Sequence, residues 1–161
     1  MPNVRLFVSL TAALLLALAC DSEIREINVS QEKYIDDYIN GQLADYEVFR
    51  NEGVSRVVVE AGMQGGPVLE RGDSVYLFYA GYIFGQSGPG SRFVLDSGMV
   101  RVGRGDLIDG LDKGLPGARQ GEEALLLFTS EHGYGAQAVG LVPENSALLF
   151  DVRVGTIKKK Q

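Results

Sequence analysis

From residue 53 onward, short apolar runs rich in β-branched residues alternate with turn residues. Four runs cover residues 55–60, 74–84, 123–129 and 147–157, each bounded by Gly, Pro, Asn or Asp. This pattern is typical of β-strands. A further strand is expected to begin around residues 99–102. Because the runs lie too close together for helical crossovers throughout, we expect a mainly antiparallel sheet.

Two helices are expected besides the strands. Tyr34, Ile35, Tyr38 and Ile39 repeat at helical spacing after Ser30, a good N-cap, which predicts a helix over residues 31–40 that ends at Gly41. This helix either packs against its own domain or pairs with another copy of the chain. A short second helix is expected after Asp106 as N-cap and should end near Gly114. The fold class is therefore α+β, and residues 85–91 are expected to form a flexible surface loop.

The N-terminus has the features of an export signal. Arg5 precedes an apolar run, Leu6 to Ala19, that is shorter than the roughly 20 residues needed to cross a bilayer. The stretch LLLALAC resembles a bacterial lipobox, although Ala17 stands where leucine is usual. The resemblance implies that Cys20 is lipidated and holds the protein to a membrane of a bacterial cell envelope. The alternative is an ordinary signal peptide with an incidental cysteine.

These features predict three parts: a signal peptide over 1–19, a segment over 20–52, and a globular domain over 53–161. The middle part would hold the lipidated cysteine, a spacer over 21–29 and the first helix. Cys20 is the sole cysteine of the 161 residues, so no intramolecular disulfide can form.

Charge and motifs exclude several classes of function. The formal net charge of -6 argues against a nucleic-acid partner, which would need a basic face. Lys158 to Lys160 are expected to form a solvated tail. The dinucleotide pattern G-x-G-x-x-G, a phosphate loop and a G-x-S-x-G elbow are all missing from the sequence. We therefore expect no nucleotide cofactor and no hydrolytic triad.

Metal binding is also disfavoured. Asp106, Asp109 and Asp112 recur at every third residue but lack the spacing of a calcium loop, so an N-cap and a solvated helix face explain them more simply. His132 is the only histidine, and we interpret it as a loop residue without a catalytic partner.

What remains is a set of apolar and aromatic residues with no nucleophile among them. By residue type alone these would simply be a hydrophobic core. The set comprises Tyr79, Tyr82, Phe84, Phe93, Leu107, Ile108, Leu111, Tyr134 and Phe150.

The order of several motifs changes this interpretation. The turn and strand RGDSVYLFYAGY come first, then a helix with the pattern G-x-x-x-x-I-x-G-L-x-x-G-L, the turn GYG and the final strand ALLFDV. This series, over about Val68 to Val154, resembles FKBP-type peptidyl-prolyl isomerases. The resemblance implies a twisted antiparallel sheet of about five strands around one short helix, here with an N-terminal helical extension. It implies proline-containing polypeptides as clients and no cofactor.

The resemblance also implies a set of site residues. The proline ring would lie against Tyr79, Phe93, Leu107, Ile108 and Phe150, above Leu111. The backbone N–H of Ile108 and the hydroxyl of Tyr134 would donate to substrate carbonyls. Asp96 would be the acid at the edge of the pocket, and Leu141 and Val142 would lie in a flap over it.

The sequence departs from the family pattern at three places, one of which is the loop over residues 85–91, expected to reshape the edge of the pocket. Leu111 stands where many members have a tryptophan floor. The family's F-D-S motif is blurred into RFVLDS, so either Phe93 or Leu95 could take the aromatic position, and with Phe93 there Val94 would replace the acid. These departures leave a second hypothesis open, a non-catalytic peptide-binding or chaperone module that uses the same pocket.

Overall fold

The computed structural model describes the backbone of residues 3–160 and the side chains of residues 22–160. Over this part, six strands form one antiparallel sheet in the order β1-β2-β5-β6-β3-β4. The elements are α1 (Asn3–Gln42), β1 (Glu47–Asn51), β2 (Val54–Glu60), β3 (Ser74–Gly85), β4 (Gly88–Arg101), α2 (Asp109–Gly114), β5 (Glu123–Phe128), the 3-10 helix η1 (Ser130–His132) and β6 (Ala147–Lys158).

The predicted α+β fold is confirmed, with one strand more than expected. The four predicted runs correspond to β2, β3, β5 and β6. The strand β1, which was not expected, pairs with β2 from Glu47 to Asn51, so the sheet begins before residue 53. The stretch EVFRN carries no alternating signal, because its two apolar residues are adjacent, and four of its five side chains are exposed.

The strand expected around residues 99–102 is the end of a much longer one. β4 begins at Gly88 and pairs with β3 along its length, so residues 85–91 form a tight hairpin and not the flexible loop that the composition suggested. The two strands are joined by Gln86 and Ser87 alone, and Gly88 adopts a φ of 104°, which favours glycine.

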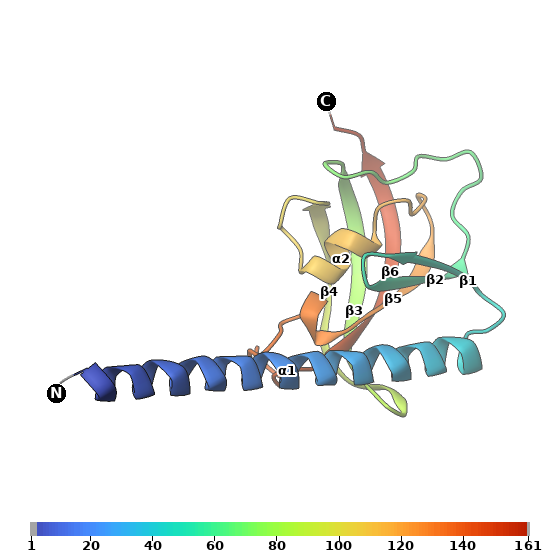
Figure 1. Cartoon of the computed structure of the whole chain (residues 1–161). Helices are drawn as coiled ribbons and strands as arrows, with labels where there is room; N and C mark the ends of the chain where they lie inside the picture. Colours follow the sequence, from blue (N-terminus) through green and yellow to red (C-terminus); the bar gives the residue numbers. More distant parts are fainter. Residues whose placement is uncertain (1–2, 161) are drawn as a thin grey trace.

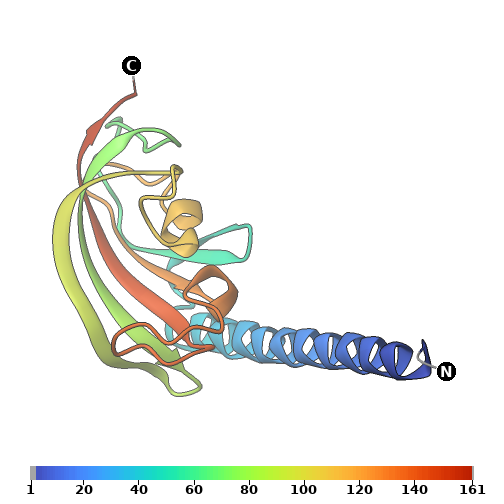
Figure 2. The same ribbon diagram turned by 90° about the vertical axis from the view of Figure 1, so that its left-hand side faces the viewer.

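The sheet curves around α2, which lies against its inner face (Figure 2). The main core fills the space between them, with Leu77, Leu126 and Phe128 fully buried. α2 begins at Asp109, with Ile108 as N-cap, and not directly after Asp106 as expected. The carbonyl of Ile108 accepts hydrogen bonds from the N–H groups of Leu111 and Asp112, which places the first helical turn there.

The helix α1 is far longer than the predicted helix over residues 31–40. Its backbone is helical through the expected spacer over 21–29, and Ser30 lies within the helix instead of capping it. The side chains of the predicted signal peptide over 1–19 and of Cys20 lie outside the described residues. Within the described residues, no helix has the length and apolarity required to cross a membrane.

The second half of α1 packs against its own domain, one of the two alternatives left open above. Ile35 and Ile39 are buried against Leu127 and Leu149. Leu126 and Phe150, which pair across β5 and β6, belong instead to the core under α2. Because side chains alternate along a strand, α1 and α2 cover opposite faces of the sheet. The N-terminal half of α1 projects beyond the sheet (Figure 1).

The C-terminal lysines are exposed, as expected of a solvated tail, but two of them are fixed to the domain. Lys159 donates to the carboxylate of Asp73 at 2.8 Å, and the backbone N–H of Lys160 donates to the other carboxylate oxygen at 2.9 Å. Asp73 is fully buried. Burial alone would raise the pKa of Asp73, but its hydrogen bonds with Lys159, Lys160 and Glu70 outweigh burial and lower it. The end of the chain is thereby fixed to the turn that precedes β3.

Candidate active site

A cavity of about 190 Å³ opens between the inner face of the sheet and α2. It brings together residues from β3, β4, β6, the segment before α2, α2 itself and the loop after η1. Its lining consists of Tyr79, Val94, Asp106, Leu107, Ile108, Leu111, Tyr134 and Phe150. Six of the eight predicted site residues therefore lie in one cavity, and Phe93 lies directly behind it.

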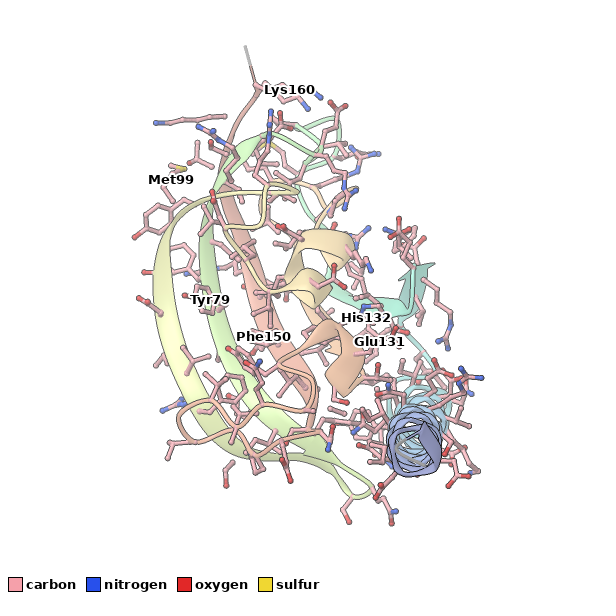
Figure 3. All side chains as sticks on the ribbon, turned by 60° about the vertical axis from the view of Figure 1, so that its left-hand side comes forward. Tyr79, Met99, Glu131, His132, Phe150 and Lys160 are labelled. Atoms are coloured by element: carbon pink, nitrogen blue, oxygen red, sulfur yellow. The ribbon has the colours of Figure 1, made fainter. Side chains whose placement is uncertain are left out.

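The aromatic wall of the cavity is built around Phe150 on β6. Its ring stacks on Phe128 with centroids 5.9 Å apart, and the ring of Phe93 meets it edge-on at 5.7 Å. The ring of Tyr79 lies at 6.3 Å from Phe150 (Figure 3). Edge-to-face and offset contacts of this kind add stability beyond the burial of area. Phe150 is therefore held in one orientation by neighbours on three sides.

A glycine in β3 makes this wall possible. A β-carbon at Gly81 would lie 2.7 Å from the ring of Phe93, 2.7 Å from Val94 and 2.9 Å from the ring of Phe150. Glycine in the middle of a strand is a signal of such close approach. The importance of Gly81, within the stretch FYAGYIF, was missed by the sequence analysis although the signal was present.

The opposite wall is set by the segment that leads into α2. Leu107 and Ile108 are half-buried, and Leu111 is 3% exposed and closes the bottom of the cavity. The carboxylate of Asp112 accepts hydrogen bonds from the N–H groups of Gly103 and Gly105, both at 2.9 Å. Asp112 is thus buried and shapes the loop before α2, which corrects its interpretation as part of a solvated helix face.

Tyr134 forms the third side of the cavity, and its loop is closed by backbone hydrogen bonds. The N–H of Gly135 donates to the carbonyl of Ser130 at 2.9 Å, and the N–H of Asn145 donates to the carbonyl of Gly135 at 2.7 Å. The ring of Tyr134 meets that of Phe93 edge-on, with centroids 6.3 Å apart. Burial raises the pKa of Tyr134, so its hydroxyl is protonated at neutral pH and able to donate.

Asp96 reaches the edge of the site but does not line it. The hydroxyl of Tyr79 donates to Asp96 at 3.5 Å, the outer limit of a hydrogen bond. Burial raises the pKa of Tyr79, and the negative charge of Asp96 raises it further. The two residues pair across β3 and β4, whereas Val94 faces the cavity.

The ambiguity within RFVLDS is resolved by a shift in the pairing of β3 with β4, which leaves Phe93 without a partner on β3 between Arg92 and Val94. Phe93 packs on Phe150 and Tyr134, while Leu95 is 66% exposed. Phe93 therefore takes the aromatic position, and Val94 stands beside the cavity where the acid was expected. Val94 and Asp106 both line the site, and neither was among the predicted site residues.

Of the two residues predicted to form a flap over the cavity, Leu141 is exposed and Val142 is buried. Val139 and Val142 form a tight turn, with backbone hydrogen bonds of 2.9 and 3.0 Å. Leu141, at its tip, is 75% exposed. Val142 is 2% exposed and belongs to the main core, so it anchors the turn and cannot close over the cavity as expected.

Other residues of the aromatic set lie elsewhere. Tyr82 and Phe84 pack under α1, on the other face of the sheet. His132 lies in η1, where its Nδ1 is 2.6 Å from the carboxylate of Asp109, and Asp109 also pairs with Lys113 at 2.9 Å. These contacts tie η1 to α2 outside the cavity. Within the side chains described, no group of three or more His, Cys, Asp or Glu residues is suited to a metal ion.

A larger groove, of about 790 Å³, lies between α1 and the hairpin that joins β3 to β4. Its walls include Lys33, Asp37, Gln42 and Gln86. Such polar walls would not desolvate a ligand, whereas the smaller cavity under α2 has aromatic and aliphatic walls. The smaller cavity is therefore the better candidate for a binding site.

Comparisons with known proteins point to one family. Residues 66–155 match a family model described as FKBP-type peptidyl-prolyl cis-trans isomerase. A peptidyl-prolyl cis-trans isomerase of Schizosaccharomyces pombe is 36% identical over 117 residues, which cover 68% of this chain and 98% of the relative. FK506-binding protein 1 of Aspergillus oryzae is 33% identical over 113 residues, 63% of this chain and 96% of that protein.

A solved structure has the same fold. The crystal structure of the three FKBP domains of wheat FKBP73 aligns with a TM-score of 0.61 at 21% identity, over 71% of this chain and 50% of the other. The helix α1 precedes the residues that match the family model.

Replacing Gly81 by alanine should disturb the aromatic wall. The new methyl group would force Phe93, Val94 or Phe150 to move, and overpacking of this kind costs about 1–3 kcal/mol. Gly98→Ala is the matched control, because a β-carbon there meets no atom within 4 Å. Urea unfolding followed by circular dichroism should show a lower midpoint for Gly81→Ala only. Equal midpoints for the two variants would contradict the close packing described here.

Proposed function

Because the chain belongs to the family of FKBP-type peptidyl-prolyl cis-trans isomerases, we propose that the cavity under α2 is where it rotates X-Pro peptide bonds. The protein is an isomerase of this type, and FKBP proteins bind proline-containing substrates. The observation that carries the proposal is the convergence of Tyr79, Ile108, Tyr134 and Phe150 on one largely apolar cavity, with Phe93 packed against the rings of Tyr134 and Phe150.

The reaction requires no nucleophile. Rotation about the peptide bond is opposed by a barrier of about 18–20 kcal/mol, because the C–N resonance must be broken. The planar amide is more polar than the twisted one, so an apolar site that removes water disfavours the planar form. The proline ring would lie against Phe150 and Tyr79, with Phe93 supporting Phe150 from behind. Leu111 would lie below the ring, and Leu107 and Ile108 would form the opposite wall.

Two donors would then hold the twisted form. The hydroxyl of Tyr134 and the backbone N–H of Ile108 would donate to carbonyl groups of the substrate. Such fixed donors accelerate a reaction when they bind the transition state more tightly than the ground state. Asp96 would act indirectly, through its hydrogen bond with the hydroxyl of Tyr79. Leu141, exposed at the tip of its turn, would contact residues of the client that flank the proline.

Removing the hydroxyl of Tyr134 tests this arrangement. Tyr134→Phe keeps the ring contact with Phe93, and it loses one neutral hydrogen bond, worth about 0.5–1.5 kcal/mol. The kcat/KM for a proline-containing peptide should therefore fall by about 2- to 13-fold, with the melting temperature nearly unchanged. Tyr76→Phe, on the outer face of the sheet, is the control and should retain full activity. An unchanged kcat/KM at unchanged stability would remove Tyr134 from the site.

We further propose that the protein is exported, is anchored by a lipid at Cys20 in a bacterial cell envelope, and acts there on exported proteins. The lipobox-like stretch LLLALAC after Arg5 and an apolar run supports this location. The helical backbone from residue 21 to the first packed residues of α1 would act as a stiff connection, in place of a flexible spacer.

Anchoring predicts a specific labelling result. After growth of an expressing bacterium with a fatty-acid analogue, the full-length chain should carry the label, and Cys20→Ala should carry none. Ser22→Ala, two residues away, serves as the control and should be labelled like the unmodified chain. Equal labelling of the Cys20→Ala variant and the unmodified chain would end the proposal of a lipid anchor.

A further inference from the structure

We propose that Gln31 on α1 is a positioning residue that holds the loop bearing Tyr134. The inference rests on the role proposed above for Tyr134, and it assigns a catalytic contribution to a helix that precedes the family match. Gln31 does not line the cavity. It acts through two backbone groups at the base of the loop.

Gln31 is buried, and its amide group makes two hydrogen bonds to distant parts of the chain. Its Oε1 accepts from the N–H of Ser130 at 2.7 Å, and its Nε2 donates to the carbonyl of Asn145 at 2.7 Å. Only 4% of Gln31 is exposed. One side chain therefore connects the two segments between which the Tyr134 loop begins and ends.

The loop itself completes a closed ring of hydrogen bonds. The carbonyl of Ser130 accepts from Gly135, and the carbonyl of Gly135 accepts from Asn145. In the sequence, Tyr134 lies between Ser130 and Gly135. The ring thus runs from Gln31 to Ser130, Gly135 and Asn145 and back to Gln31. A shift of Ser130 or Asn145 away from Gln31 would move the loop, and with it the hydroxyl of Tyr134, relative to Ile108 across the cavity.

Two further features support a positioning role. Asn28, one turn earlier on α1, accepts a hydrogen bond from the hydroxyl of Ser130 at 2.9 Å, so Ser130 is held from α1 at both its backbone and its side chain. Asn145 has a φ of 54°, a left-handed conformation that asparagine adopts more readily than most other non-glycine residues, so the turn at this point of the ring suits its residue. Figure 3 shows η1, marked by Glu131 and His132, directly beside α1.

The test replaces Gln31 by methionine, which has a similar length and no hydrogen-bonding amide. The kcat/KM for a proline-containing peptide should fall by about 2- to 10-fold, and by no more than in Tyr134→Phe. Ile39→Val is the matched control: it weakens the packing of the same helix without touching the ring. It should lower the melting temperature and leave kcat/KM unchanged below that temperature.

A double variant separates positioning from general destabilisation. If Gln31 acts through Tyr134, combining Gln31→Met with Tyr134→Phe should lower kcat/KM no further than Tyr134→Phe alone. Amide exchange at Gly135 and Asn145 should also be faster in Gln31→Met than in Ile39→Val. An unchanged kcat/KM in Gln31→Met, or fully additive losses in the double variant, would overturn the inference. An unchanged kcat/KM in Tyr134→Phe itself would instead contradict the proposed site.

Discussion

The close approach of α2 to the inner face of the sheet is the constraint on which the rest of the structure depends. A β-carbon at Gly110 would lie 2.5 Å from the ring of Phe128, and one at Gly114 would lie 2.8 Å from Leu126. Phe128 in turn stacks on Phe150. The absence of side chains on one face of the helix thus fixes the distance between the aromatic wall on β6 and the Leu107–Ile108 wall before α2, and so the width of the cavity.

Much of the fold could be predicted because its signals are local. Alternating apolar runs located β2, β3, β5 and β6, and the order of the motifs placed six of the lining residues in one cavity. The missing strand β1 has mostly exposed side chains, and β4 is an edge strand whose residues alternate weakly. Such strands form because a neighbour offers hydrogen bonds, which a single sequence does not reveal.

The errors at individual residues have a common origin in long-range contacts. From its sequence position Asp112 was predicted to lie on a solvated helix face, but its carboxylate accepts hydrogen bonds from the N–H groups of Gly103 and Gly105. Lys159 was predicted to be part of a solvated tail, but its ammonium group donates a hydrogen bond to Asp73, 86 residues away. Gln31 carried no signal at all, because its partners Ser130 and Asn145 lie 99 and 114 residues away. The choice between Phe93 and Leu95 likewise depended on the structure, because an irregular pairing of β4 with β3 at Phe93 separates two residues that would otherwise share a face.

In the proposed function, the apolar cavity lowers the barrier to rotation of X-Pro bonds. Exchange spectroscopy on a proline-containing peptide tests this most directly, since the uncatalysed interconversion takes tens to hundreds of seconds. We expect the rate of cis–trans interconversion to rise in proportion to the concentration of the full-length protein, while the ratio of the two isomers stays the same. Binding of the peptide at Phe150 and Tyr134 with an interconversion rate that stays at the uncatalysed value would contradict it.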